Sequence, residues 1–473
     1  MNDDDLLLGT GLDGETGRPL GRDLDLDLAL RVATGLRLPP AEAARDRREV
    51  ERRREGDLGG RWGVLEKDLA SSGWAVLFPA EGDPEVRRAL EPLLALRREE
   101  AGRHYRQLEG PEGYRPGEGF RELAQRLGLS PDAPDPERFP CHLLLVGGPE
   151  QIPFEIQERL GRSYNVGRLA FDTAAEHGSY ARSVVAQARG EGPKRRELAF
   201  FGARNPGDGA MAKTCDRLVA PLARRTAEKA AGRPVAAHLA DAATKARLGE
   251  LLGGAATPAL LFAAAHGISW GAGHPRQREE QGALVCQDFP GDQAWAGRGP
   301  IPPEHTFAAA DLVGRDADLS GLVAFLFACH GWGTPELDAY PERESGEPRR
   351  LAPAPLLARL PQRLLAHPGG GALAVIGHLE RTWGYSFLWK GLGDHRQPFE
   401  EGLDMLLDGL PVGAALEPFR DRALRLRVEL AEEIESLRAG EIREHESLVA
   451  LYTAAHDARN YFLLGDPAVK LAG

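Results

Sequence analysis

The stretch Leu322–Gly331 (LVAFLFACHG) places seven apolar residues directly before a cysteine, a histidine and a glycine. A run of this length, closed by glycine, predicts a strand that is buried on both faces. Ala259–Gly267 (ALLFAAAHG) repeats the arrangement, with His266 where the first stretch has Cys329. The two stretches therefore predict two buried strands, each ending in a chemically reactive side chain.

Apolar runs of the same kind recur along the chain and alternate with helical segments. Residues 141–146, 197–201 and 371–376 each precede a glycine, and residues 210–230 and 240–252 are helix candidates. This alternation predicts an α/β fold with a doubly wound, mostly parallel sheet flanked by helices. We also predict a strand at 74–79, a helix at 84–106, a helical region at 417–456 and a final strand at 460–471.

The composition excludes several classes of protein. With 473 residues, 42% of them hydrophobic, the chain can bury a sizeable core. The formal net charge of -12 argues against nucleic-acid binding, which needs a surplus of Lys and Arg. No apolar run approaches the roughly 20 residues that cross a bilayer, and the acidic start of the sequence lacks the basic region of a secretory signal. We therefore expect a soluble, cytoplasmic protein that binds neither nucleic acid nor membrane.

The cysteines and histidines suggest neither a metal site nor a cofactor. Cys141, Cys215, Cys286 and Cys329 include no CxxC pair, which is typical of a reducing compartment and excludes an evident zinc knuckle. The histidines are scattered, and the sequence has neither a phosphate-binding loop nor an H-E-x-x-H helix.

Cys329 and His266 form a candidate catalytic pair. The carboxyl ends of neighbouring parallel strands meet at one edge of a sheet, where active sites form. A thiol next to an imidazole can lose its proton and become a nucleophile. The nearby glycines, Gly267 and Gly331, let the chain turn sharply and let backbone N–H groups approach a substrate. We predict that the N–H groups of Gly267 and Cys329 form an oxyanion hole.

Two other readings remain open at this stage. Gly267-Ile-Ser269-Trp-Gly271 matches the G-x-S-x-G nucleophile elbow of serine hydrolases, with Ser269 as nucleophile. That elbow needs a helix directly after the serine. Gly271–Pro275 contains two glycines and a proline, which argue against a helix there. The chain could alternatively be a catalytically silent scaffold that binds other proteins.

The context of the cysteine resembles known peptidases. Ala328-Cys329-His330-Gly331 resembles the caspase nucleophile motif, and four further segments resemble gingipains and CHAT-domain proteins in the same order. These segments are LLLVGGPEQIPF (143–154), VGRLAFDT (166–173), IGHLERTWGYSF (376–387) and LLGDPAVKL (463–471). The resemblance covers residues 138–473.

The resemblance implies a caspase–haemoglobinase fold and a domain division. It implies a smaller α/β subdomain at 138–192 and a caspase-like catalytic domain at 193–473, while residues 1–137 have no assigned role. It implies a regulated, intracellular cysteine endopeptidase that acts on protein or peptide substrates, has a regulatory protein partner and serves in bacterial defence. Asp208 occupies the place of a third catalytic residue that orients His266, although it also suits a turn.

The resemblance further implies a pocket for the residue before the cut. Its candidate residues are Asp288, Glu380 and Trp383. An acidic pocket favours Arg or Lys, which is the preference we expect, whereas Arg381 in the pocket would favour an acidic residue. The loop 340–350 occupies the place of the caspase inter-subunit linker, which predicts self-cleavage after Arg349 or Arg350.

Overall fold

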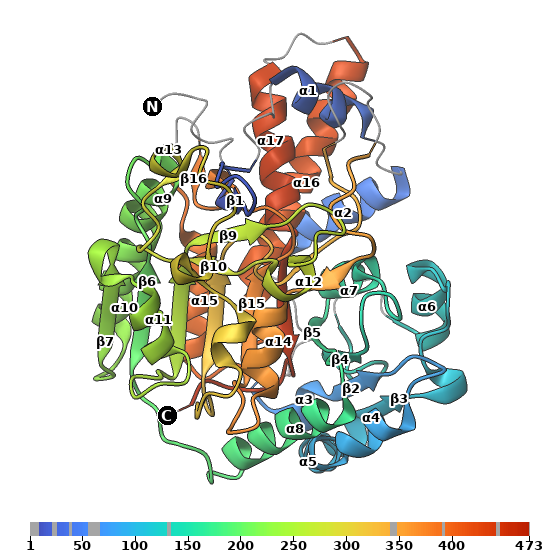
Figure 1. Ribbon diagram of the computed structural model, residues 1–473. Coiled ribbons are helices and arrows are strands. Elements are labelled where there is room, and N and C mark those ends of the chain that lie inside the picture. The colour runs from blue at the N-terminus through green and yellow to red at the C-terminus, as the bar shows by residue number, and fades with distance from the viewer. Residues whose placement is uncertain are drawn as a thin grey trace.

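One large sheet runs through the molecule (Figure 1). The computed structural model describes residues 9–20, 26–36, 40–54, 67–129, 134–340, 348–389, 393–440 and 445–472. Within these residues the sheet has ten strands in the order β3-β2-β4-β5-β18-β15-β12-β8-β6-β7. Their bounds are β2 Trp74–Leu77, β3 Tyr105–Leu108, β4 His142–Val146, β5 Asn165–Leu169, β6 Leu198–Gly202, β7 Val235–Leu239, β8 Leu260–Ala264, β12 Val323–Phe327, β15 Ala374–His378 and β18 Tyr461–Gly465.

The sheet consists of two parallel blocks that run in opposite directions. Strands β15, β12, β8, β6 and β7 are parallel to one another, and strands β18, β5, β4, β2 and β3 form the second block. The blocks meet where β18 pairs antiparallel with β15. The mostly parallel α/β sheet expected from the sequence is therefore confirmed.

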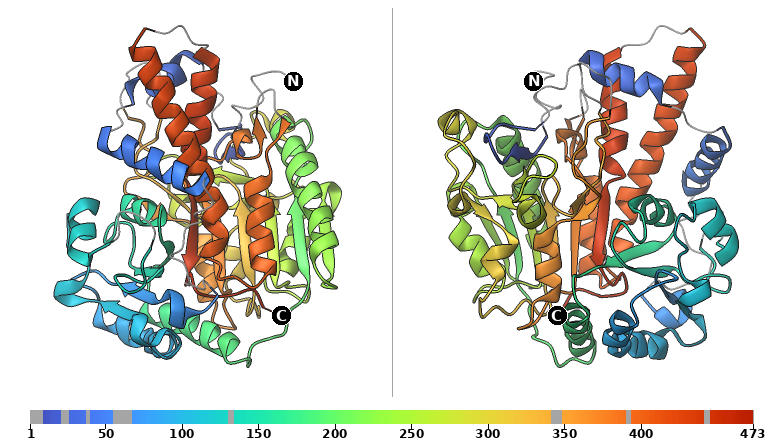
Figure 2. Two further views of the ribbon diagram at one scale, coloured as in Figure 1. Left: turned by 180° about the vertical axis from the view of Figure 1, so that it is seen from behind. Right: turned by 45° about the vertical axis from the view of Figure 1, so that its right-hand side comes forward.

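Helices cover both faces of the sheet (Figures 1 and 2). Helices α11 (Lys245–Leu251) and α14 (Arg359–Ala366) lie on one face, and α15 (Gln397–Leu407) and α16 (Glu417–Arg438) lie on the other. Aromatic side chains fill the interface between the sheet and helix α15. Phe325 of β12 stacks on Phe262 of β8 with ring centroids 5.0 Å apart, and Phe399 of α15 packs against both.

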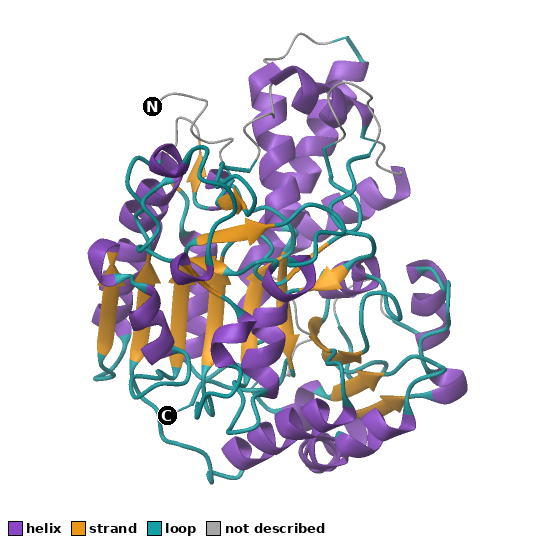
Figure 3. Cartoon of the chain, in the orientation of Figure 1, coloured by secondary structure: helices purple, strands orange, loops and turns teal. Residues whose placement is uncertain are grey.

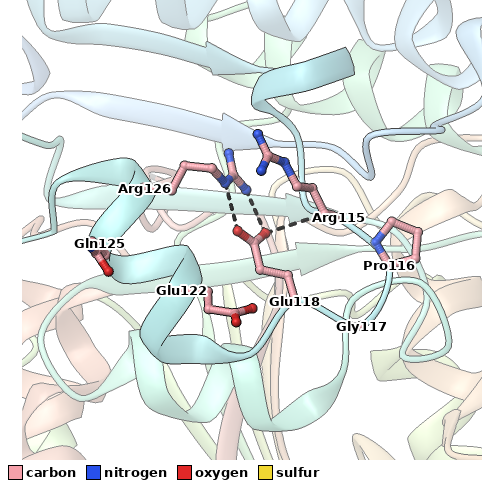
Figure 4. A pocket seen from close by; sticks show the side chains of 7 residues that line it. All are labelled: Arg115, Pro116, Gly117, Glu118, Glu122, Gln125 and Arg126. Atoms are coloured by element: carbon pink, nitrogen blue, oxygen red, sulfur yellow. Dashed lines mark hydrogen bonds and ion pairs between the residues drawn. The ribbon is translucent and has the colours of Figure 1, made fainter.

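Further helices extend the molecule at two ends (Figure 3). Helices α16 and α17 (His445–Ala458) project beyond the sheet, where α1 (Leu26–Gly35) and α2 (Pro40–Arg54) pack against them. Helices α4 (Pro84–Ala89), α5 (Glu91–Ala101) and α8 (Ala174–Ala188) pack together beside the second block of strands. A pocket beside helix α6 (Phe120–Leu127) is lined by residues of the 115–126 segment, in which Arg126 forks onto Glu118 (Figure 4).

A small second sheet positions the residues that follow β8. It has the order β1-β9-β10-β11, with β1 at Gly11–Asp13, β9 at His266–Ser269, β10 at Leu284–Val285 and β11 at Thr306–Phe307. β9 lies across the carboxyl ends of the parallel block (Figure 1). This small sheet has a separate hydrophobic core, in which Leu12, Ile268 and Trp270 are fully or almost fully buried.

Most predicted elements are present, but several boundaries differ, and the final strand predicted at 460–471 is only Tyr461–Gly465. Each of the five apolar runs overlaps one strand of the large sheet. The helix predicted at 84–106 ends at Ala101, because Gly102 adopts a φ of +53°, and Tyr105–Leu108 forms β3 instead. Strand β2 pairs with β4, and β3 pairs with β2, so both continue the sheet across residue 137. The domain division at 137 and 192 stays a prediction.

Candidate active site

Cys329 lies two residues beyond the end of β12 and is completely buried. Its neighbour His330 has a φ of +57°, so the chain leaves the strand direction immediately after the cysteine. The backbone N–H of Thr382 donates to Cys329 Sγ at 3.2 Å, and the hydroxyls of Thr382 and Thr10 lie 3.7 and 3.9 Å from the sulfur. The sulfur thus sits in a small polar nest formed by two segments far apart in the sequence.

Burial controls the ionisation of this thiol. It raises the pKa of Cys329 to about 11, although the hydrogen bonds from Thr382 and Thr10 act in the opposite direction. The thiol is therefore neutral near pH 7 while it is covered. A base is needed to produce the thiolate, the nucleophilic form.

His266 and Asp208 form a hydrogen-bonded pair on the same edge of the sheet. Ala264 of β8 pairs with Phe327 of β12, so His266 and Cys329 each lie two residues beyond the same register position. His266 Nε2 bonds to Asp208 Oδ2, and both side chains are buried. Among the described residues, the buried Nδ1 of His266 has no hydrogen-bond partner. This nitrogen is therefore the one free to exchange a proton with a reacting group.

Asp208 is held by a helix as well as by the histidine. It is the N-cap of α9 (Gly209–Lys213), and its Oδ1 accepts a hydrogen bond of 2.9 Å from the backbone N–H of Met211. Burial raises the pKa of Asp208, but the charge and hydrogen bond of His266 lower it more, so that the pKa lies below its ordinary value. The carboxylate is thus ionised and fixed against the imidazole.

The amides predicted to form an oxyanion hole converge on one oxygen. The N–H groups of Gly267 and Cys329 donate to the carbonyl oxygen of Thr10, at 3.1 and 3.5 Å. Only glycine fits at position 267, because a Cβ there would lie 1.8 Å from the carbonyl oxygen of Cys329. Two amides aimed at one carbonyl beside a thiol form the arrangement that stabilises a tetrahedral oxyanion.

Glu380 and Arg381, in the predicted pocket region, are buried in a charged cluster. The Glu380 carboxylate accepts from Arg381 at 2.9 Å and contacts His456 at 3.3 Å, and Arg381 also bonds Asp338. Burial raises the pKa of Glu380, but His456 and Arg381 lower it well below its ordinary value. The charge of Glu380 is therefore already matched by protein partners.

Trp383 and Asp288 differ in their surroundings. Trp383 is fully buried beside this cluster, with its ring centroid 6.0 Å from that of Tyr340, and its backbone N–H donates to Asp457. Asp288 is exposed, and its carboxylate accepts a hydrogen bond from the backbone N–H of Lys245 at the start of α11. Asp288 is thus engaged with a helix N-terminus.

The remaining candidates lie outside strands β8 and β12. Arg349 and Arg350 are exposed, and Arg350 forms a β-bridge with Leu337, whereas residues 341–347 of that loop lie outside the described residues. Ser269 ends strand β9, and the next helix, α12, begins at Gln277. The chain after Ser269 therefore lacks the helix that a nucleophile elbow requires.

Thr382 and Thr10 were not identified from the sequence. Thr382 lies within the segment IGHLERTWGYSF, which suggested a pocket through its tryptophan but gave no reason to select the threonine. Thr10 lies in the region without an assigned role, and no pattern there indicates a partner 319 positions away. Both residues reach Cys329 only through the fold.

Two further features concern metals and membranes. Where the structure describes the chain, no group of three His, Cys, Asp or Glu side chains is placed to hold a metal ion. The described helices also include none with both the length and the apolar character needed to cross a bilayer.

Known structures share this architecture. No protein family model matches the sequence, and no curated protein matches it either. A solved protease superposes with a TM-score of 0.50 at 12% identity, covering 85% of this chain and 80% of its own. The chain is thus similar in fold to a protease, in agreement with the fold expected from the sequence.

Two of the matching structures come from one particular peptidase. The Arg-specific cysteine proteinase gingipain R superposes with a TM-score of 0.44 at 10% identity, covering 86% of this chain and 79% of its own. The complex of the pro- and mature domains of RgpB from Porphyromonas gingivalis gives a TM-score of 0.44 at 10% identity, covering 84% and 79%.

Proposed function

We propose that the chain is a cysteine endopeptidase. Cys329 attacks the carbonyl carbon of a peptide bond while His266 takes up the thiol proton, and the N–H groups of Gly267 and Cys329 hold the oxyanion. His266 then gives a proton to the leaving amine, which produces a thioester. Water hydrolyses the thioester, and Asp208 keeps the imidazole oriented throughout.

One observation carries this proposal. The two amides beside Cys329 already hold a peptide carbonyl oxygen, that of Thr10, in the position of a substrate carbonyl. A scaffold would have no need for two converging amides, a buried thiol and an Asp–His pair at one strand edge. The strand ends therefore favour catalysis over the scaffold, and Cys329 over Ser269.

The residue preferred before the cut stays a prediction. The sequence favours Arg or Lys, which requires a carboxylate that is free to pair with the substrate. Glu380 is already paired with Arg381 and His456. The Asp288 carboxylate already accepts a hydrogen bond from the backbone N–H of Lys245. Both observations weaken the expected preference for Arg or Lys. A positional-scanning peptide library measures this preference directly.

The proposed biological setting rests on the resemblance. Intracellular action, a regulatory protein partner and a role in bacterial defence stay predictions, as does self-cleavage after Arg349 or Arg350. The exposure of both arginines is compatible with such a cut. An active preparation whose 340–350 segment remains intact on a denaturing gel would contradict it.

Hydrolysis of an unfolded protein such as reduced casein tests the proposal. We expect the purified chain to cleave casein, Cys329→Ala to lose at least about 10³-fold in rate, and Cys215→Ala to retain full activity as the matched buried cysteine. Iodoacetamide should abolish turnover, whereas a serine-directed phosphonate should not. Full activity of Cys329→Ala would end the proposal, and inhibition by the phosphonate would favour Ser269.

A further inference from the structure

Residues 9–13 run through the candidate site as an extended peptide would, and residues 14–20 turn and fold back beside them. The N–H of Thr10 donates to the carbonyl of Thr382 at 2.9 Å, and Gly9 forms an antiparallel bridge with Trp383. On the other side of Thr10, β1 pairs in parallel with β9 (Figure 1), with Gly11 opposite Gly267. Backbone pairing on both sides of one residue is how a peptide is held as an added strand.

The peptide bond after Thr10 is the one presented to the nucleophile. The Thr10 carbonyl oxygen occupies the oxyanion hole, and the Thr10 hydroxyl lies 3.9 Å from Cys329 Sγ. A Cβ built on Gly11 would lie 2.8 Å from that sulfur. Only glycine can therefore follow Thr10 in this pose, and the sulfur lies against the junction between the two residues.

The same segment closes the site to other substrates. Cys329 is 0% exposed and His266 is 1% exposed. An external peptide cannot reach either residue while Thr10 occupies the space between the amides and the sulfur. Opening the site requires that the chain up to Thr10 leave.

We propose that Cys329 cuts its own chain at the Thr10–Gly11 peptide bond, an inference that rests on the proposed function. The sulfur bonds to the Thr10 carbonyl carbon as the carbon–nitrogen bond to Gly11 breaks. The thiol proton passes through His266 to the departing Gly11 nitrogen, which becomes a new amino terminus. Water then hydrolyses the Thr10 thioester, which regenerates the thiol and releases a peptide that ends in the Thr10 carboxylate.

The proposal also identifies a substrate class. The buried Thr10 side chain contacts the hydroxyl of Thr382, so the position before the cut holds a small hydroxyl side chain. The position after the cut holds glycine. After the cut, β1 stays paired with β9, because Leu12 is fully buried and the Gly11 carbonyl accepts from Leu20 at 2.8 Å. The space that Thr10 occupied beside Cys329 is then open to external chains.

The test follows the amino terminus over time by sequencing and intact mass, with casein turnover measured on the same samples. We expect a new Gly11 terminus to form at a rate independent of protein concentration, because the reaction is intramolecular. Cys329→Ala should stay uncut. Gly11→Val should slow the cut by at least about 100-fold. Gly271→Val, at an exposed glycine with no atom near its Cβ position, should cut at the wild-type rate.

Two measurements keep the outcomes separate. Thermal unfolding checks that Gly11→Val is folded, and Thr10→Pro, which removes the N–H that donates to Thr382, should also slow the cut. Casein turnover by a chain whose Thr10–Gly11 bond stays intact would overturn the self-cut and leave the proposed function standing. A cutting rate that rises with protein concentration, or persistent cutting in Gly11→Val, would also overturn it. Absence of both reactions would overturn the proposed function as well.

Discussion

At the scale of single residues, Asp208 combines two tasks in one carboxylate. One oxygen caps helix α9 through the N–H of Met211, and the other bonds to His266. Asparagine preserves a capping oxygen but removes the charge that stabilises a protonated imidazole. The substitution Asp208→Asn therefore separates the capping of α9 from the proposed role of Asp208 beside His266.

We expect Asp208→Asn to lower kcat by about 10²- to 10⁴-fold while KM and the unfolding temperature change little. Thr244→Ala is the matched control, since Thr244 caps α11 without touching His266. That variant should lose about 1 kcal/mol of stability and keep its activity. Steady-state kinetics and thermal unfolding measure both. Equal kinetic losses in the two variants would show that Asp208 is only a cap.

The ionisation of Cys329 gives a second prediction at this scale. Burial raises the pKa of Cys329 to about 11, and the thiolate is the form that reacts with iodoacetamide. Alkylation of the uncut chain should therefore be slow at pH 8 and rise as the pH approaches 11. A chain that starts at Gly11 has a less covered thiol, so its profile should rise at lower pH.

Mass spectrometry of the peptide containing residue 329 measures this alkylation at each pH. Cys215 in the same digests is the internal control, because its surroundings do not involve residues 9–20. Identical pH profiles for Cys329 in the two chains would show that residues 9–20 do not control its ionisation.

At the scale of elements, the site depends on how closely β9 passes the end of β12. Gly267 lies against the carbonyl of Cys329, where a Cβ would approach to 1.8 Å. Because the overlap is with backbone, β9 must shift to accept any side chain, and the shift would carry the Gly267 N–H away from the oxyanion position.

Gly267→Ala should therefore reduce activity by roughly 10²- to 10³-fold, as loss of one oxyanion donor does, and should lower stability by about 1–3 kcal/mol. Gly271→Ala, four residues further along and exposed, should alter neither. Casein turnover and urea unfolding provide the measurements. Wild-type turnover in Gly267→Ala would exclude its N–H from the reaction.

Elements with a strong local pattern were predictable from the sequence, and the others were not. β8 and β12 are continuous apolar runs, so both their type and the reactive residues after them could be read directly. β5 was missed because it includes Arg168, which is buried but bonds to Gln157 and to the Gly147 carbonyl. β1 has only three residues and pairs with a strand more than 200 positions away, so nothing local reveals it.

At the scale of the whole molecule, Asp466 links the end of the last strand to residues from the first half of the chain. Its carboxylate, fully buried after β18, bonds to Arg97 of α5 at 2.7 Å and to the indole N–H of Trp74 in β2 at 2.9 Å. Its backbone N–H donates to the hydroxyl of Tyr180. The segment LLGDPAVKL thus has a structural role, because it links the end of β18 to β2, α5 and α8 on the second block of the sheet.

Asp466→Ala should lower the free energy of unfolding by about 3–5 kcal/mol, because it leaves Arg97 buried without this partner. Glu85→Ala, which removes an exposed ion pair with Arg88, should cost no more than about 1 kcal/mol. Urea unfolding followed by circular dichroism compares the two. Equal losses would contradict the role of Asp466 as the buried link.

The central claim is that Cys329 is the nucleophile that attacks a peptide carbonyl, and covalent trapping of an activated cysteine tests it most directly. A peptidyl acyloxymethyl ketone with the sequence Leu-Gly-Thr reacts irreversibly with an activated cysteine at such a site. After tryptic digestion and mass spectrometry, we predict a single adduct on Cys329 in the chain that starts at Gly11, and strong loss of labelling in His266→Ala. An adduct on another residue, or no adduct in a chain that hydrolyses casein, would contradict the account.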